Sequence, residues 1–375
     1  MNILFLDSIE PQTYGGMEEW IRLTAGGLAE RGHHVVLAGR PGSEFLNRVG
    51  GGNASLTTVA LNISGDFNPA TIAKLKRLLT GHQIDVISVN FNKDVRLGGL
   101  AARLDGRTRV VWSVGLDITK GSFAHRVLTP KLVDSVIVPS ESLKQQITRW
   151  GYIPPEIVTV IPIGIPDIPL PTTAERETAR RRLGVDSGAV LAVTSGRFVE
   201  HKGHRYLVEA AAHIADKHPD VHYLFLGDGP LRPELENRIE VAGLTNRFIL
   251  TGMIGDVPAV LPAADLMIHP SVDEPFGIAI LEGMRAGLPI IAARVGGIPE
   301  VVGGESAAEL VSPADSQALA RAISKVISDP ATRETMARAA RGRYLKQFRY
   351  DTMIERAEAS FASVCKASGS AHGTA

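Results

Sequence analysis

Short apolar runs alternate along the chain with segments in which apolar residues recur every three or four positions. The runs have the length of buried strands, and the longer segments have helical periodicity. Such alternation favours parallel sheets with helices on both faces. The expected strands are 2–7, 34–38, 84–89, 109–113, 134–139, 189–195, 222–226, 248–251, 266–269 and 289–292. The expected helices are 17–31, 68–80, 95–104, 141–150, 204–217, 234–242, 278–286, 316–328, 330–346 and 351–367.

A proline-rich stretch at 159–171 interrupts this alternation, which restarts after it. Proline fixes φ and lacks an amide hydrogen, so a stiff, non-helical linker is expected there. The sequence therefore predicts two Rossmann-like, doubly wound α/β domains, at 1–165 and 172–347, facing a cleft. A helix at 348–367 and a loose tail at 368–375 follow. Ligands of such sheets bind at the carboxyl ends of the strands.

Composition narrows the class of protein. The 375 residues include 40 Lys and Arg against 40 Asp and Glu, which argues against nucleic-acid binding by bulk charge. Cys365 is the only cysteine, so neither an intramolecular disulfide nor a cysteine-ligated metal is expected. The N-terminus lacks the features of a signal peptide, and no run is long enough for a membrane span, so a cytoplasmic protein is expected. Residues 1–165 carry 17 Lys and Arg against 14 Asp and Glu. This small excess would suit peripheral contact with the inner membrane surface, although a solvated helix face is the simpler explanation.

A glycine pair, Gly15-Gly16, lies between the first expected strand and the helix that follows. Glycines there let a backbone approach a phosphate, and the helix N-terminus offers free N–H groups and a positive dipole end. A tight turn that needs positive φ explains the pair equally well. The stretch lacks the GxGxxG fingerprint, which weighs against dinucleotide binding.

Two cations follow a later strand. Gly196 and Arg197 come directly after it, and Lys202 lies five residues beyond Arg197 in the same loop. Arginine offers a planar fork to phosphate oxygens and lysine a mobile point charge, so together they would neutralise a diphosphate. The alternative is a pair of solvated surface cations.

Two carboxylates, Glu274 and Glu282, lie on either side of an expected helix start. Gly277 permits a tight turn, and the N–H groups of Ile278 and Ala279 would be free in the first helical turn to meet an anion. Carboxylates suit the hydroxyls of a ribose or a sugar. The alternative is that Glu274 only caps the helix and that Glu282 pairs at the surface.

Histidines near these loops carry weaker signals. His201 and His204 flank Lys202, but no carboxylate pattern supports a metal there, and no metal site is expected. His269 ends a strand and is expected to be packed or hydrogen-bonded rather than catalytic.

In combination, these motifs resemble the GT-B retaining glycosyltransferases, specifically glycosyltransferase family four (glycosyl transferases group 1). The matching residues are Gly15-Gly16, Gly196-Arg197, Lys202-Gly203, Pro270-Ser271, Glu274, Gly277, Glu282 and the stretch Gly296-Gly297-Ile298-Pro299-Glu300. Seven residues separate the two glutamates. The resemblance spans nearly the whole chain and is most specific in the C-terminal half.

The resemblance implies that the N-terminal domain binds the acceptor, that the C-terminal domain binds a nucleotide-sugar donor, and that the last helix crosses back to the N-terminal domain. Arg197 and Lys202 would hold the diphosphate and stabilise it as it leaves. Glu282 would bind the ribose, and Glu274 the donor sugar near its reacting carbon. The family retains anomeric configuration and usually needs no metal, so no cofactor is expected and a UDP- or GDP-linked sugar is the substrate. The acceptor would be a carbohydrate, a lipid-linked group or a small molecule.

Backbone groups complete the implied donor site. Those of Phe276–Ala279 would contact the sugar and phosphates, and those of Met253 and Ile254 would face the base. The donor-binding residues implied in this way are Gly15, Gly16, Gly196, Met253, Ile254, Phe276, Gly277, Ile278, Ala279 and Glu282.

The chain departs from the family pattern in lacking a histidine after the strand at 109–113, and it carries Asn90 at a second position where such enzymes have one. Asp117 is the candidate for an acceptor-orienting or basic role, and a loop cap explains it equally well. Two alternatives to a transferase stay open. One is a non-hydrolysing nucleotide-sugar epimerase, which needs no acceptor, and the other is a catalytically inactive nucleotide-sugar-binding protein.

Overall fold

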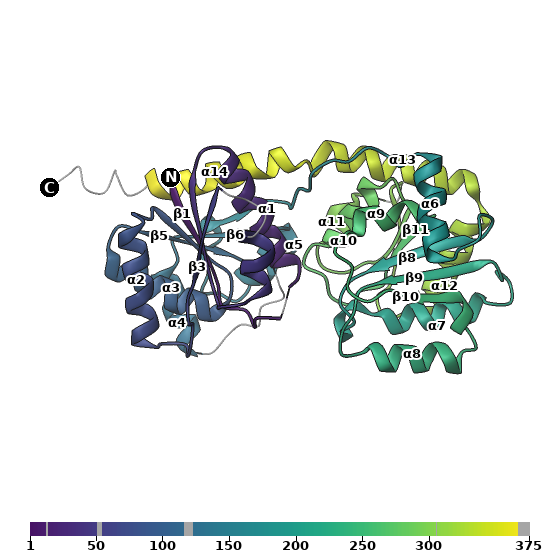
Figure 1. The fold of residues 1–375 in the computed structure, drawn as a ribbon, viewed down its shortest axis with the longest axis horizontal. Coiled ribbons are helices and arrows are strands. Elements are labelled where there is room, and N and C mark those ends of the chain that lie inside the picture. The colour runs from purple at the N-terminus through teal and green to yellow at the C-terminus, as the bar shows by residue number, and fades with distance from the viewer. Residues whose placement is uncertain (13, 51–54, 116–122, 305, 367–375) are drawn as a thin grey trace. The chain divides into compact units, whose positions relative to one another are not determined.

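The computed structural model describes residues 1–366 except 13, 51–54, 116–122 and 305. Its contacts divide the chain into two compact units, unit 1 (Met1–Gly164 with Tyr350–Ala375) and unit 2 (Ile165–Arg349). Each unit is a parallel sheet with helices packed against it (Figure 1). The expected fold class, two doubly wound α/β units, is therefore confirmed.

Unit 1 is built on seven parallel strands among the described residues, in the order β3-β2-β1-β4-β5-β6-β7. They are β1 (Asn2–Asp7), β2 (His34–Gly39), β3 (Leu56–Ala60), β4 (Val86–Val89), β5 (Arg109–Ser113), β6 (Ser135–Val138) and β7 (Val158–Val160). The central β1 pairs Ile3 with Val35 of β2 and with Val86 of β4. Its apolar residues are buried because helices cover the sheet, as continuous apolar strands require.

The helices of unit 1 come from both ends of the chain. They are α1 (Gly16–Glu30), α2 (Pro69–Gly81), α3 (Asn92–Asp105), α4 (Phe123–Leu132), α5 (Glu141–Thr148) and α14 (Tyr350–Lys366), with short turns η1 (Leu46–Gly50) and η2 (Pro155–Ile157). Helix α14 packs closely on α1, where a Cβ added to Gly27 would lie 2.6 Å from the Ile354 side chain. The Tyr350 hydroxyl donates to the Leu23 carbonyl at 3.0 Å, which fixes the start of α14.

Unit 2 repeats the architecture with strand order β10-β9-β8-β11-β12-β13. Its strands are β8 (Val190–Ser195), β9 (Val221–Leu226), β10 (Phe248–Leu250), β11 (Leu266–His269), β12 (Ile290–Ala293) and β13 (Ala308–Val311). Its helices and turns are α6 (Thr173–Leu183), η3 (Glu200–Lys202), α7 (His204–Ile214), α8 (Arg232–Val241), η4 (Thr245–Arg247), α9 (Val257–Val260), η5 (Leu261–Ala263), α10 (Ile278–Arg285), α11 (Ile298–Val302), α12 (Ser316–Ser328) and α13 (Pro330–Gln347).

Seven strands and α-helices of the described residues are not among those that the apolar pattern predicts: β3, β7, β13, α4, α6, α9 and α11. Helix α6 is strongly charged and docks through ion pairs instead of an apolar stripe, since Arg176 and Arg180 bind Asp265 at 2.6 and 3.1 Å. Strand β7 has three residues, so the stretch expected as a linker from residue 159 in fact begins within a strand.

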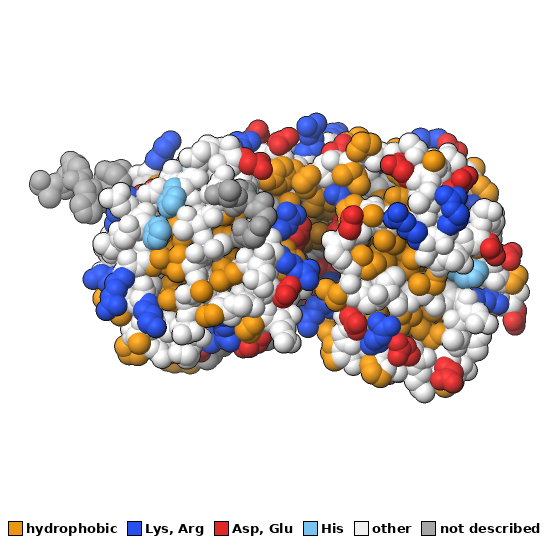
Figure 2. Space-filling view, in the orientation of Figure 1, with side chains coloured by type: hydrophobic (Ala, Val, Ile, Leu, Met, Phe, Trp, Pro, Cys, Tyr) orange, Lys and Arg blue, Asp and Glu red, His pale blue; other side chains and the backbone are white. Residues whose placement is uncertain are grey.

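Charge is mixed over the molecular surface. Figure 2 shows Lys, Arg, Asp and Glu side chains interspersed over the visible face of unit 2, in keeping with equal numbers of cationic and anionic residues in the chain. Over the described ranges, no helix is both long and apolar enough to cross a membrane.

Candidate active site

The cations and carboxylates predicted in the C-terminal half meet at one edge of the unit 2 sheet. Strands β8 and β11 are neighbours, and the chain order reverses between them because β9 and β10 continue on one side and β12 and β13 on the other. Arg197 follows the end of β8 and Glu274 follows the end of β11. Open α/β sheets bind ligands at such a switch point, outside the carboxyl ends of the strands.

Close backbone contacts hold the loops of this edge together. The His201 carbonyl accepts the Val272 N–H at 2.8 Å, which joins the β8 and β11 loops. The Glu274 carbonyl accepts the Gly297 N–H at 3.0 Å, and a Cβ on Gly296 (φ +48°) would lie 2.1 Å from the same oxygen. Only glycine fits at Gly296, because any side chain would displace Glu274.

Four polar side chains form a cluster within this edge. Lys202 Nζ donates to Glu274 Oε2 at 2.7 Å, and His269 Nε2 donates to the same oxygen at 2.8 Å. Ser271 Oγ lies 3.0 Å from His269 Nε2 and 3.5 Å from Glu274 Oε2. Glu274, His269 and Ser271 are buried, whereas the Lys202 side chain is 22% exposed. Lys202 is thus the member of the cluster that reaches solvent.

The cluster favours the ionised form of Glu274. Burial alone would raise the pKa of Glu274, but the Lys202 charge and the His269 hydrogen bond outweigh it and hold that pKa well below its usual range. Burial, together with electrostatic interactions with His269, Lys202 and His201, lowers the pKa of the neighbouring His204 to about 3. The His204 side chain is therefore uncharged near neutral pH. Its ring packs edge-on against Phe198, with ring centroids 4.9 Å apart.

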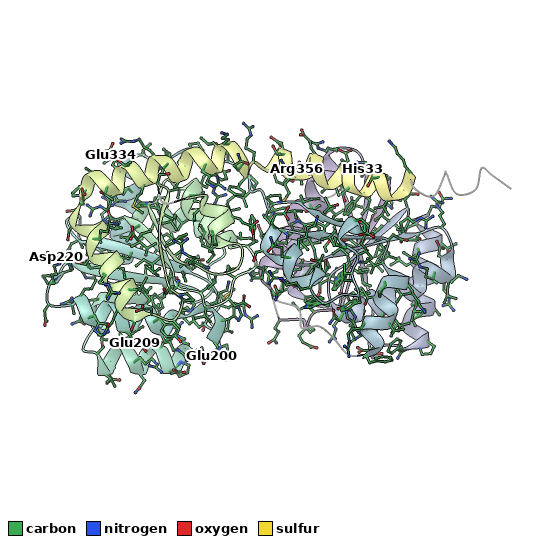
Figure 3. All side chains as sticks on the ribbon, turned by 180° about the vertical axis from the view of Figure 1, so that it is seen from behind. His33, Glu200, Glu209, Asp220, Glu334 and Arg356 are labelled. Carbon is green, nitrogen blue, oxygen red and sulfur yellow. The ribbon has the colours of Figure 1, made fainter. Side chains whose placement is uncertain are left out.

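Arg197 stands apart from the cluster. Its side chain is exposed, and within the described part of the chain it forms no ion pair. Glu200, the acidic residue of the same loop, pairs instead with Arg205 at 2.9 Å on the surface of unit 2 (Figure 3). The alternative of two solvated surface cations thus fits Arg197 alone, because Lys202 is paired.

Helix α10 starts beside Glu274 and presents its N-terminus without a side-chain cap. Glu274 does more than cap this helix, because its carboxylate accepts hydrogen bonds from Lys202 and His269. Gly277 has φ +103°, the left-handed turn expected of a glycine there. The N–H groups of Ile278 and Ala279 belong to the first turn of the helix, whose dipole favours an anion. Glu282 is half-buried on α10, four residues after Ile278.

The remaining predicted donor residues of unit 2 offer mainly backbone. Phe276 is 4% exposed and packs edge-on against Phe348, so its side chain is part of the core. Met253 and Ile254 follow β10, and the Met253 side chain is 57% exposed. The Gly196 N–H donates to Leu226 at 3.0 Å, and a Cβ on Gly196 would contact the Lys202 side chain at 3.6 Å.

Gly15 and Gly16 belong to unit 1, not to the unit that carries the other predicted donor residues. Gly15 is the N-cap of α1 with an extended φ of −157°, so the positive-φ explanation of the pair is wrong. Its N–H donates to the buried Glu18 carboxylate at 2.6 Å. The first turn of α1 therefore presents negative charge, which disfavours a phosphate at this helix end.

The candidates for acceptor handling are less well defined. Asp117 lies outside the described residues. Asn90 follows β4, where the order of the unit 1 sheet reverses; its side chain is 2% exposed and donates to the Leu6 carbonyl at 3.0 Å. The described residues contain no group of three or more His, Cys, Asp or Glu that could hold a metal ion.

Comparisons with known proteins agree with this geometry. Residues 175–343 match the family described as Glycosyl transferases group 1, and residues 14–167 match Glycosyltransferase Family 4. A 2-deoxystreptamine glucosyltransferase of Streptomyces kanamyceticus is 37% identical over 180 residues, 47% of this chain and 46% of that protein. An Escherichia coli UDP-Gal:alpha-D-GlcNAc-diphosphoundecaprenol alpha-1,3-galactosyltransferase is 27% identical over 286 residues, 72% of this chain and 74% of that protein.

The likeness to solved structures covers both units. HepE of Anabaena, crystallised in complex with UDP-glucose, is 25% identical and superposes with a TM-score of 0.84 over 97% of this chain and 100% of HepE. The chain spans about half the length of the Streptomyces relative, whereas the structural match is complete. The two family matches follow one another along the chain and include the site loops described above. The chain belongs to the family-four, group-1 glycosyltransferases, which have the GT-B fold.

Proposed function

We propose that this protein transfers a sugar from a nucleoside-diphosphate sugar to an acceptor hydroxyl, with retention of anomeric configuration and without a metal. The observation that carries the proposal is the unit 2 edge, where Lys202 pairs with the buried Glu274, helix α10 starts just after this glutamate, and the exposed Arg197 follows the neighbouring strand β8. These groups supply positive charge and N–H donors beside one carboxylate. That combination suits a diphosphate joined to a sugar.

The chemistry follows from where charge develops. Breaking the bond between the sugar and the diphosphate leaves extra negative charge on the leaving phosphate and positive character on the sugar carbon. Arg197 and Lys202 stabilise the first, and the ionised Glu274 is placed to contact the sugar. Glu282, on the next turn of α10, binds the ribose. No residue here has to form a covalent bond to sugar, unlike the nucleophile of a retaining glycosidase.

A UDP-linked donor is the first choice, because HepE was crystallised with UDP-glucose and the Escherichia coli relative is named for UDP-Gal. The relatives' names include an aminocyclitol acceptor, 2-deoxystreptamine, and a lipid-linked acceptor. We assign the acceptor to unit 1, at the carboxyl ends of β1 and β4, where the strand order reverses. The acceptor screen described next identifies the chemical class of this acceptor.

The test is a screen of UDP-, GDP-, ADP- and TDP-sugars. Each donor is measured once with EDTA and once with a divalent cation. Thermal melting reports binding, because a ligand of the native state raises its stability by mass action. Release of nucleotide reports turnover, first without acceptor and then with 2-deoxystreptamine or a polyprenyl-diphosphate sugar. Proton NMR of the product gives the anomeric configuration.

The outcomes separate the three functions left open by the sequence. A donor that stabilises the protein and is turned over in EDTA with a retained anomer supports the proposal. Interconversion of the donor sugar without an acceptor identifies an epimerase instead. Stabilisation with no turnover under any acceptor identifies an inactive binding protein, and a dependence on divalent metal contradicts the metal-free mechanism.

A further inference from the structure

We propose that His269, assisted by Ser271, is a positioning residue that holds the Glu274 carboxylate in place when Lys202 turns away from it to bind the donor diphosphate. The inference rests on the proposed function and deepens it. It concerns the step in which the free enzyme binds the donor and Lys202 exchanges Glu274 for the diphosphate. In the free enzyme Lys202 and Glu274 neutralise one another, at 2.7 Å, so the diphosphate has to compete for the lysine.

Lys202 is the mobile partner of this pair. Its side chain is 22% exposed, and its aliphatic stem passes over Gly196, where no side chain obstructs it. A lysine ammonium is a point charge on a flexible stem and changes partner readily. A diphosphate placed between Arg197 and the start of α10 offers this ammonium more negative charge than one carboxylate does.

The Glu274 side chain is unable to move with Lys202 towards the diphosphate. Its side chain is 9% exposed, and its backbone carbonyl is fixed by Gly297 and hemmed in by Gly296. A buried carboxylate that loses its cation either takes up a proton or turns towards solvent, unless another donor remains. His269 is that donor, because its Nε2–H lies 2.8 Å from the same Oε2 atom that Lys202 contacts.

His269 is itself held in a fixed setting. It is 2% exposed at the end of β11, and its ring nitrogen lies 3.0 Å from Ser271 Oγ. The charged or titratable groups that act within the cluster and on the neighbouring His204 are Glu274, Lys202, His269 and His201, and burial keeps His204 neutral. The hydrogen bond from His269 to Glu274 thus persists when the lysine leaves, and it keeps the carboxylate ionised and aimed at the sugar.

The experiment compares His269→Leu and His269→Gln with wild type, and uses His213→Leu, an exposed position on α7, as the matched control. Leucine fills the space without a donor, whereas the Gln Nε2 amide restores an N–H near the position of the imidazole Nε2. Release of UDP from UDP-glucose, or from the donor that the screen selects, is measured from pH 5 to pH 9. Thermal melting verifies that each variant is folded.

For His269→Leu we expect kcat to fall about 10- to 100-fold, the effect of losing a hydrogen bond to a charged group, with donor KM changed less than about threefold. Without this donor the pKa of Glu274 rises, so the acid limb of the kcat profile moves to higher pH. His269→Gln recovers most of kcat and the wild-type acid limb, and His213→Leu matches wild type.

Two outcomes overturn the inference while leaving the proposed function intact. One is an active wild type with a folded His269→Leu variant whose kcat and pH profile are unchanged. The other is an equal loss in His269→Leu and His269→Gln with no movement of the acid limb, which marks a purely packing role. A wild type that turns over no donor overturns the proposed function and this inference with it.

Discussion

At the scale of single residues, Lys202 and Arg197 differ in a way that their shared motif does not suggest. Both are expected to bind the diphosphate. In the free protein, however, Lys202 neutralises the buried Glu274, whereas Arg197 projects from the surface without an ion pair among the described residues. One cation is therefore paired in the folded free protein, and the other is left exposed for the diphosphate that we propose.

This difference predicts separate effects on stability. Removing one partner of a buried ion pair costs up to about 3–5 kcal/mol, and since Lys202 is partly exposed and His269 remains, we expect about 2 kcal/mol for Lys202→Met. Thermal melting should then show Tm lowered by about 4–8 °C. Arg197→Met should stay within about 2 °C of wild type, because the side chain is exposed and forms no ion pair among the described residues.

Both variants should lose stabilisation by UDP, measured as the rise in Tm with saturating nucleotide, if each removes the phosphate contact that we propose for it. Both variants replace a long cationic side chain with methionine. Arg197→Met is therefore the control for Lys202→Met, in which an ion pair is lost as well. Equal melting temperatures for the two free variants would show that the Lys202–Glu274 pair contributes nothing to the fold.

Much of this site could be predicted from sequence, because glycines, cations and carboxylates at fixed spacing keep their chemistry in any fold of the family. Glu274, Lys202 and Gly277 are examples. His269 was expected to be packed or hydrogen-bonded, and it is, but its partner could not be named. The contact joins β11, its following loop and the η3 turn, and only the tertiary structure brings those three segments together.

At the scale of elements, the beginning of α3 holds an unfavourable charge. Asp94 in the first turn is 0% exposed and accepts the Phe91 N–H at 3.2 Å. Its position at a helix N-terminus favours the ionised form by about 0.3–1 kcal/mol. Burial nevertheless wins and raises the pKa of Asp94 to about 6. Asp7, at the end of β1, has its pKa raised by burial and by the charges of Asp94 and Glu18.

A pH-dependent stability follows from Asp94. Between about pH 4 and pH 6 the folded chain keeps a proton on this group that the unfolded chain has lost, so stability falls as pH rises through that window. Above pH 6 the penalty is complete, at most about 3 kcal/mol. We expect Asp94→Asn to raise Tm at pH 7.5 by several degrees and to bring a clearly smaller gain at pH 4.5, where only part of the penalty is present.

The measurement is thermal melting of wild type and variant at both pH values, so that other titrating groups cancel in the difference. Glu156→Gln, at an exposed position in η2, is the control and should change neither. An Asp94→Asn variant that is destabilised equally at the two pH values would show that the hydrogen bonds of the carboxylate outweigh its burial.

The elements themselves divide into those that sequence reveals and those that it does not. Strands such as β1 and β11 are continuous apolar runs, which is the signature of a strand buried on both faces. The unpredicted β7 and β13 have three and four residues, and β3 at the sheet edge reads Leu-Thr-Thr-Val-Ala with only its first residue buried. Such short or edge strands form because a neighbouring strand offers hydrogen bonds. That pairing is a long-range interaction, which the local pattern of apolar residues does not contain.

At the scale of the whole molecule, unit 1 is assembled from two distant parts of the chain. The chain leaves it at Gly164, forms unit 2, and returns at Tyr350 to supply α14. The returning helix buries Met353, Ile354 and Phe361, and Phe361 lies against Phe5 of β1 with ring centroids 6.1 Å apart. The stability of unit 1 therefore depends on a segment that follows unit 2 along the chain.

Phe361→Ala tests this dependence. The side chain is 0% exposed, and truncating a buried phenylalanine costs about 3–5 kcal/mol. That is a large share of the 5–15 kcal/mol that typically stabilises a folded domain, so amides of β1 and α1 should lose much of their protection in hydrogen exchange.

Glu334→Ala on α13, an exposed partner of Arg338 (Figure 3), should cost less than about 1 kcal/mol because surface ion pairs contribute little. Amides of β8 and β9 should keep their protection in Phe361→Ala if α14 stabilises unit 1 alone. A parallel loss there would mean that the two units unfold as one.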